Sequence, residues 1–103
     1  MTQSRTNRPA ATNRYRVVLG ATIREIRNEK KLTLRQVAQR SYISVGHLSE
    51  VENGYKEISS ELLDEVVFGL DISLAELIIR VGWNLAGYQT SDLEVELDYL
   101  IPK

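Results

Sequence analysis

The sequence predicts an all-α fold of five helices, organised around two short helices joined by a tight turn. Thr33 and Gln36 have the spacing of a capping box, in which the residue before a helix and the third helical residue exchange hydrogen bonds. A few residues later, Ser44 precedes a second apolar run and is expected to cap a second helix. We therefore expect helices over residues 34–41 and 45–53, in a helix-turn-helix arrangement.

Apolar residues in this stretch occupy the offsets at which two crossed helices must touch. They are Val37, Ala38, Ile43, Leu48 and Val51. Ala38 is small where the second helix is expected to cross closely. Gly54 then ends the second helix, because glycine adopts the left-handed conformation at a helix end at the least cost.

Three further helices are predicted around this centre. Apolar side chains recur at helical spacing between residues 14 and 30, which predicts the first helix. Ser59 or Ser60 is expected to cap a fourth helix over residues 61–70, with an apolar stripe along one side. Ser73 and Glu76 form another capping box, so a fifth helix is expected to begin there and to reach Leu85 or Tyr88.

The two ends of the chain are treated as separate segments. Residues 1–13 are polar and carry Arg5 and Arg8, so they are expected to form a disordered basic arm. Residues 14–80 are assigned to the helix-turn-helix domain and residues 81–103 to a C-terminal extension. The last stretch alternates like a strand and also fits one helical face, and the capping-box spacing of Ser91 and Glu94 favours a sixth helix.

Charge is distributed unevenly along a chain whose net charge is only −1. Residues 1–56 contain eleven Lys and Arg against four Asp and Glu, whereas residues 57–103 contain two against ten. This asymmetry favours a basic half that faces nucleic acid and an acidic half turned away from it. A basic tail followed by ordinary solvated helices would give the same counts, but the helix-turn-helix lies in the basic half.

Cysteine and histidine, which bind zinc and often serve in nucleophilic catalysis, are almost absent from the sequence. The chain has no cysteine and a single histidine, His47, so neither a zinc site nor a nucleophile and base pair can be assembled. Asp92, Glu94, Glu96 and Asp98 alternate with apolar residues and are interpreted as a solvated face rather than a calcium loop. We therefore expect no enzyme activity, no cofactor and no membrane span, and a cytoplasmic, nucleoid-associated protein.

Double-stranded DNA is the expected partner. Short polar side chains at the start of a recognition helix allow close approach to phosphates and base edges. The base-facing set is expected to be Val45, Gly46, His47, Ser49 and Glu50. Ser44, Arg35, Gln36, Tyr55 and Lys56 are expected to flank the groove and add phosphate or base contacts.

The spacing A38-x5-S44-x4-S49-x2-E52-x-G54, with Arg27 and Leu32 upstream, resembles the Cro and phage-repressor (XRE-type) class of helix-turn-helix domains. This resemblance implies a five-helix, lambda-repressor-like fold with a C-terminal helical extension. It also implies a structural pair between Arg27 and Glu52. The sequence departs from the class where Leu34 replaces a polar residue, and where Lys31, Tyr42 and Asp71 replace common glycines.

The longer run GHLSEVENGYKEISSELL, from Gly46 to Leu63, resembles the actinobacterial Clp gene regulators. The resemblance implies a transcriptional activator of Clp protease and stress genes, with RNA polymerase as a further partner. An antitoxin-type module, which binds both a partner protein and its own promoter, is the alternative from another functional class. An adjacent small toxin gene would favour that alternative.

A homodimer is expected, because one recognition helix covers too few base pairs for regulatory specificity. The motif face is committed to DNA, so the dimer surface must lie elsewhere. The predicted surface is the surplus apolar part of the fifth helix and the tail: Ile78, Ile79, Val81, Trp83, Leu85 and Tyr88, with Leu93, Leu97 and Leu100. Folding of the tail onto its own fifth helix would hide the same residues within one chain.

Overall fold

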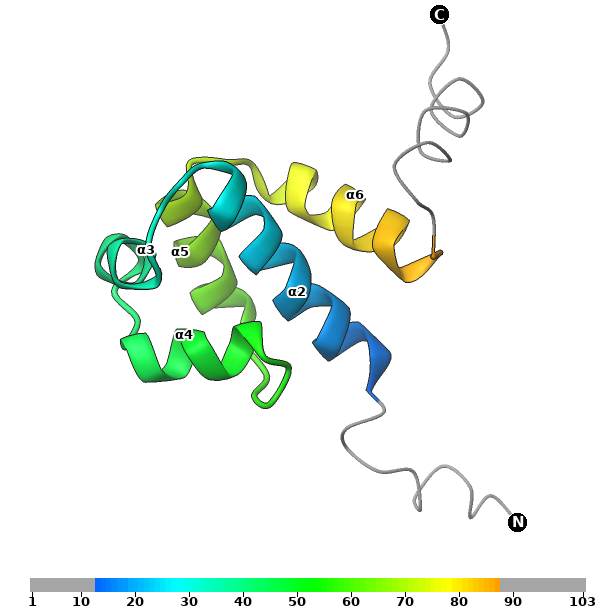
Figure 1. The fold of residues 1–103 in the computed structure, drawn as a ribbon, viewed down its shortest axis with the longest axis horizontal. Helices are drawn as coiled ribbons and strands as arrows, with labels where there is room; N and C mark the ends of the chain where they lie inside the picture. Colours follow the sequence, from blue (N-terminus) through cyan, green and yellow to red (C-terminus); the bar gives the residue numbers. More distant parts are fainter. Residues whose placement is uncertain (1–12, 88–103) are drawn as a thin grey trace, which may run out of the picture.

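The computed structural model describes residues 13–87, which form five helices: α2 (Arg14–Glu29), α3 (Leu34–Ser41), α4 (Val45–Glu52), α5 (Ser60–Leu70) and α6 (Leu74–Leu85). The long helix α2 lies between α4 and α6, and α3 packs against α5 (Figure 1). The all-α prediction is confirmed. The predicted sixth helix and all of the predicted basic arm except Asn13, which caps α2, fall on residues outside 13–87.

Each of the predicted helix starts has a side-chain cap. Thr33 Oγ1 accepts a hydrogen bond from the Gln36 N–H (3.0 Å), and Gln36 Oε1 accepts one from the Thr33 N–H (2.8 Å), which completes the predicted capping box. Ser44, Ser59 and Ser73 cap α4, α5 and α6 by accepting one backbone N–H each, and Glu76 does not return the second hydrogen bond of the capping box predicted with Ser73. These caps satisfy backbone N–H groups that a helix start leaves without partners, so local sequence fixes where each helix begins.

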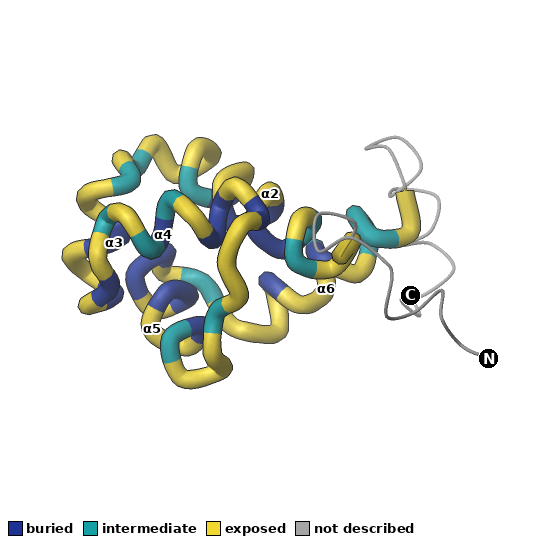
Figure 2. The backbone as a smooth tube through the Cα atoms, turned by 90° about the horizontal axis from the view of Figure 1, so that it is seen from below, coloured by how far each residue is buried: buried dark blue, intermediate teal, exposed yellow. Residues whose placement is uncertain are grey.

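The core lies where the five helices converge (Figure 2). Ile23, Leu48, Leu70 and Leu77 are completely buried and come from four different helices. Every apolar residue predicted at the crossing of α3 and α4 is buried: Val37, Ala38, Ile43, Leu48 and Val51. Burying an aliphatic side chain of this size contributes about 1.5–3 kcal/mol, so this cluster fixes the angle between α3 and α4.

Two glycines allow helices to approach closely. A Cβ at Gly20 would collide with the carbonyl oxygens of Val51 and Glu52, so α2 passes directly over the C-terminal turn of α4. A Cβ at Gly69 would collide with Ser41 Oγ, where α5 crosses α3. The helix-turn-helix is therefore held from both sides by backbone contact.

Three turns use a left-handed residue that is not glycine. Lys31, Tyr42 and Asp71 have φ angles of 59°, 55° and 60°. Each position was identified from the sequence as one where glycine is common, and the turns keep their left-handed shape without it. Each non-glycine residue in this conformation costs roughly 1 kcal/mol, which the packing on either side must offset.

Helix α6 is the last helix among residues 13–87. It ends at Leu85, the nearer of the two predicted ends, and it runs across the predicted domain boundary between residues 80 and 81. Val81, predicted to lie on the dimer surface, is only 3% exposed and belongs to the core, so that assignment was wrong. Apolar spacing alone does not distinguish the two sides of an apolar-rich helix such as α6. No helix among residues 13–87 is long and apolar enough to cross a membrane.

Candidate nucleic-acid interface

Helices α3 and α4 present one side to solvent. Gly46 and Glu50 are exposed on α4, while Val45, His47 and Ser49 are partly exposed. Val45 also packs against the edge of the core, so its side chain lies partly against the core and partly in solvent. A Cβ at Gly46 would meet nothing within 4 Å among residues 13–87, so no contact in this part of the chain requires a glycine here.

The first turn of α4 carries two kinds of polar group. Ser44 is exposed, and its Oγ accepts a hydrogen bond from the His47 N–H (3.0 Å). The hydroxyl hydrogen of Ser44 therefore remains available to donate. Backbone N–H groups in the first turn of a helix have no helical acceptor and favour a phosphate. The first turn of α4 therefore offers hydrogen-bond donors of the kind that a phosphate accepts.

The predicted flanking residues stand on either side of this turn. Arg35, Gln36 and Tyr55 are exposed, and Tyr55 has 75% of its surface in solvent. Gln36 Oε1 is already occupied by the Thr33 N–H, so only the amide nitrogen of Gln36 is free for a phosphate. Arg35 has no ion-pair partner among residues 13–87.

Two of the predicted DNA-contacting residues contact each other. Lys56 Nζ lies 3.8 Å from Glu50 Oε1, and both side chains are at least half exposed. An exposed pair at this distance is worth about 0–1 kcal/mol, so a phosphate can replace Glu50 as the partner of Lys56. Glu50 therefore partly neutralises the lysine in the free protein.

Behind the exposed face, a buried ion pair fixes α4 to α2. Arg27 Nε and Nη2 donate to the two oxygens of Glu52, at 2.7 and 3.0 Å. Arg24 Nε lies 3.4 Å from the same carboxylate, whose side chain is only 2% exposed. Hydrogen bonding to Glu52 raises the pKa of Arg27 above its usual range. The pairing of Arg27 with Glu52 that the resemblance implied is thus present, and both residues are positioning residues.

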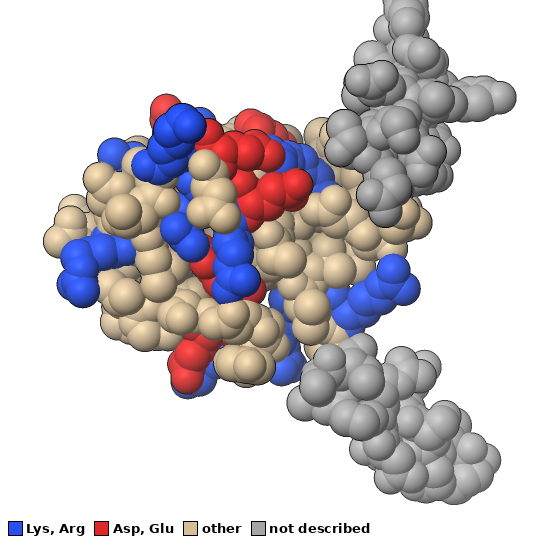
Figure 3. Space-filling view, viewed as in Figure 1, with Lys and Arg blue, Asp and Glu red and all other residues tan. Residues whose placement is uncertain are grey.

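The expected separation into a basic and an acidic half is not seen on the face shown in Figure 3, where the two signs are interspersed. The reason is that ion pairs join the two halves. Arg16 pairs with Glu57, and Arg80 pairs with Glu25 and Glu29. Because α2 and α6 pack side by side, charges distant in sequence become neighbours.

Sequence reasoning missed Arg16 and Glu57, which lie beside the predicted flank residue Lys56. Arg16 and Glu57 are 41 positions apart and fit no helical spacing. The only feature of the sequence that could have indicated Arg16 as a site residue is its charge, on a helix that was already predicted. The partner of Arg16 required the three-dimensional fold.

The predicted dimer residues are divided among different environments. Ile78 and Ile79 are 49% and 50% exposed on α6, whereas Trp83 and Leu85 are partly buried. Leu85 packs against the core from outside. Tyr88, Leu93, Leu97 and Leu100 fall outside residues 13–87. Among those described residues, no group of three or more His, Asp or Glu could hold a metal ion.

Comparisons with known proteins agree with this geometry. Residues 23–77 match the model of the helix-turn-helix family HTH_3. The chain is 39% identical over 71 residues to the transcriptional regulator ClgR of Mycobacterium tuberculosis, and this match spans 69% of the chain but only 63% of that protein.

Solved structures extend the comparison. The clp gene regulator ClgR of Corynebacterium glutamicum is 44% identical, with a TM-score of 0.65 over 68% of this chain and 91% of that one. The wild-type restriction-modification controller protein C.Esp1396I is 19% identical, with a TM-score of 0.68 over 72% of this chain and 96% of that one, and it shares the fold. The chain belongs to the XRE-type helix-turn-helix family of DNA-binding transcriptional regulators, which are not enzymes.

Proposed function

We propose that this protein binds a two-fold symmetric operator as a homodimer and activates Clp protease genes. The observation that most supports the proposal is the accessibility of the first half of α4. Ser44 and Gly46 are exposed there, and His47 is partly exposed. The similarity to ClgR proteins at 39–44% identity supports the choice of clp promoters. Activation of those promoters would require a contact with RNA polymerase in addition to DNA.

In the proposed complex, α4 enters the major groove. Val45, Gly46, His47, Ser49 and Glu50 then face base edges, where Glu50 can accept from a cytosine amino group. The recognition helix carries no arginine, so guanine must be read by His47 or by Arg35 from the start of α3. Ser44, Gln36, Tyr55 and Lys56 contact phosphates and set the register.

The proposed dimer forms through the outer side of α6. Leu74, Ile78 and Ile79 expose 40%, 49% and 50% of their surfaces, which is a costly arrangement for an isolated small domain. The buried residues of α6 are Leu77 and Val81 instead. Two recognition helices in such a dimer should lie about 34 Å apart, one turn of DNA.

The phosphate contacts are tested by salt dependence on a clp promoter fragment. Lys56→Ala should weaken binding to all sequences similarly, and Arg35→Ala should do the same if Arg35 contacts a phosphate rather than a guanine. Each should flatten the slope of log K against log salt by about 0.9, because one counterion fewer is released. An unchanged slope with an altered base preference would show that the residue reads a base instead.

The dimer is tested by sedimentation of matched variants. Ile79→Glu and Trp83→Glu should give monomers and lose most operator affinity. Phe68→Glu is the control, because Phe68 is 74% exposed on α5 and outside the proposed surface. A wild-type protein that stays monomeric at high micromolar concentration, or a Phe68→Glu variant that dissociates, would contradict this surface.

The sign of regulation needs a reconstituted transcription assay. RNA polymerase, the promoter fragment and the purified protein should give more transcript than polymerase and promoter alone. A decrease in transcript at saturating protein would identify a repressor and would leave the DNA-binding part of the proposal intact.

A further inference from the structure

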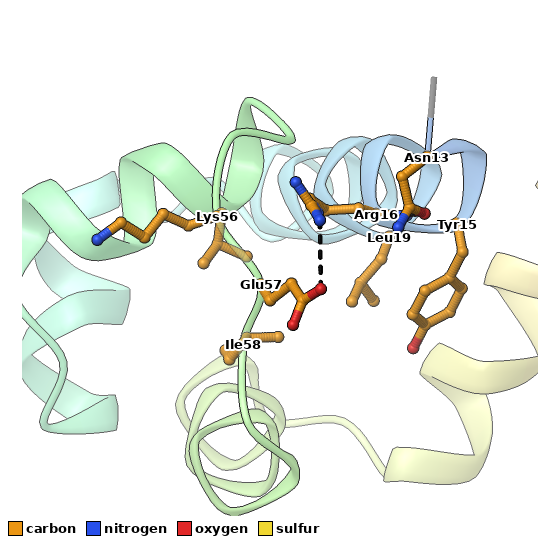
Figure 4. Close-up of a pocket in the computed structure, with 8 residues that line it drawn as sticks. Asn13, Tyr15, Arg16, Leu19, Lys56, Glu57 and Ile58 are labelled. Carbon is orange, nitrogen blue, oxygen red and sulfur yellow. Dashed lines mark hydrogen bonds and ion pairs between the residues drawn. The ribbon is translucent and has the colours of Figure 1, made fainter. Parts of the chain in front are cut away.

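A cavity of about 240 Å³ lies between the start of α2 and the segment that connects α4 to α5 (Figure 4). It is lined by Asn13, Tyr15, Arg16, Leu19, Val51, Lys56, Glu57 and Ile58. The proposed DNA contacts use only the Lys56 side chain from this set, and that ammonium group points away from the cavity. The cavity therefore has no part in the function proposed above.

The floor of the cavity is apolar. Leu19 and Val51 belong to the core, with 4% and 1% of their surfaces exposed, and Ile58 is partly buried beside them. Tyr15 forms a wall and keeps half of its surface in solvent. An apolar floor with a few polar groups at the edge is the usual composition of a small-molecule site.

The polar edge is made by Arg16 and Glu57. The Arg16 side chain is 19% exposed, and its Nη2 donates to Glu57 Oε2 at 3.2 Å. Arg16 Nε is buried and has no hydrogen-bond partner among residues 13–87. Glu57 is 77% exposed and is free to move away, whereas the guanidinium is confined. A buried N–H without an acceptor destabilises the protein, so an incoming acceptor would gain from pairing with Arg16.

We propose that this cavity binds a small apolar carboxylate, with the carboxylate on Arg16 and the hydrocarbon on the floor of Leu19, Val51 and Ile58. A planar guanidinium recognises a carboxylate through two parallel hydrogen bonds. A volume of about 240 Å³ suits a ligand smaller than drug-sized molecules, whose sites occupy about 300–1,000 Å³. If the ligand also carries an α-ammonium group, Glu57 is placed to accept it, and the ligand is then an apolar amino acid.

The site touches the DNA-reading helix. Val51 belongs to α4, and Lys56 and Glu57 belong to the segment that follows it. A bound carboxylate neutralises Arg16 and adds negative charge beside Lys56, so it should weaken DNA binding by roughly fivefold, the lower end of typical coupling. This coupling rests on the proposed DNA-binding function, whereas ligand binding by the free protein does not.

The test uses three matched probes, isocaproate, isohexyl alcohol and L-leucine, titrated into the full chain without DNA and followed by amide NMR. Isocaproate should shift the signals of Leu19, Val51 and Glu57 with a Kd of about 1 mM or tighter. Isohexyl alcohol, which lacks the carboxylate, should bind at least tenfold more weakly. Tighter binding of leucine than of isocaproate identifies an amino-acid site, and the reverse order identifies a plain carboxylate site.

Arg16→Gln should abolish the isocaproate shifts, and Arg14→Gln is the control from the same helix turn, because Arg14 is exposed and does not line the cavity. Ile58→Trp should fill the cavity from the segment that connects α4 to α5. It should abolish isocaproate binding while the amide spectrum remains that of a folded protein. Absence of shifts at the cavity residues, equal binding of the alcohol, or normal binding by folded Arg16→Gln would each overturn the proposal. If the wild-type protein shows the isocaproate shifts but does not bind the operator, only the proposed DNA-binding function is rejected.

Discussion

Two pairs of arginine and glutamate tie α2 to its neighbours, and they differ mainly in burial. Arg27 and Glu52 join α2 to α4 through hydrogen bonds of 2.7 and 3.0 Å. Glu29 and Arg80 join α2 to α6 through hydrogen bonds of 2.8 and 2.6 Å. The Glu52 side chain is 2% exposed, whereas the Glu29 side chain is 52% exposed.

Bond lengths alone would rank the two pairs as equal. Water screens the Glu29 carboxylate, so its pair with Arg80 is worth about 0–1 kcal/mol. Removing one partner of a buried pair instead leaves an uncompensated charge and costs about 3–5 kcal/mol. We infer that the buried ion pair between α2 and α4 fixes the position of α4. The exposed ion pair between α2 and α6 makes only a small contribution to the free energy of unfolding.

The largest expected effect is that of Glu52→Ala. It removes the acceptor of Arg27 and the nearby partner of Arg24, so the free energy of unfolding should fall by about 3 kcal/mol or more. Urea denaturation at neutral pH measures this loss. Replacing both partners, as Arg27→Met with Glu52→Leu, should restore part of it, because no buried charge is then left unpaired.

Glu50→Ala is the matched control, since Glu50 lies two residues away on the exposed side of the same helix. Its free energy of unfolding should change by less than about 0.5 kcal/mol, as for most surface substitutions. Equal losses for Glu50→Ala and Glu52→Ala would remove the distinction between the inner and outer sides of α4.

The next effect concerns recognition rather than stability. His47→Ala should change operator preference by about 1–3 kcal/mol at the base pair that His47 reads, and should leave the thermal midpoint nearly unchanged. Competition binding with single-base operator variants measures the preference. An unfolded His47→Ala protein would mean that the outer side of α4 had been assigned backwards.

Much of the fold could be predicted from the sequence, because its signals are local. Thr33, Ser44 and Ser73 cap helices within three or four residues of their own position, and the structure places α3 exactly where that spacing predicts. The left-handed positions Lys31 and Tyr42 were indicated only by the class resemblance, because glycine is common there in the class.

Features that depend on tertiary neighbours could not be predicted. Val81 and Ile78 are three positions apart on one helix, yet the first is buried against the core and the second is half exposed. Arg80 could not be paired with Glu29 from the sequence, because they are 51 positions apart. The Arg16 cavity likewise exists only once α2 packs beside the segment after α4. Arg27 and Glu52 were paired in advance only because a family resemblance implied it.

The smallest expected effect tests the exposed pair. Hydrogen bonding to Arg80 lowers the pKa of Glu29, and the same bond raises the pKa of Arg80. A carboxyl group whose pKa is lowered by folding stabilises the protein above its unfolded pKa, and this contribution is lost as pH falls through the lower folded value. Glu29→Gln should therefore reduce the free energy of unfolding by about 0.5 kcal/mol at pH 7. The difference from wild type should start to shrink as the pH falls below about 4.3 and should vanish below the lower folded pKa of Glu29. Because screening also weakens exposed pairs, molar salt should shrink the difference at pH 7, whereas the loss caused by Glu52→Ala should persist. Urea titrations of both variants at two pH values and two salt concentrations separate these cases. A Glu29→Gln loss as large and as salt-resistant as that of Glu52→Ala would show that burial does not set the two pairs apart.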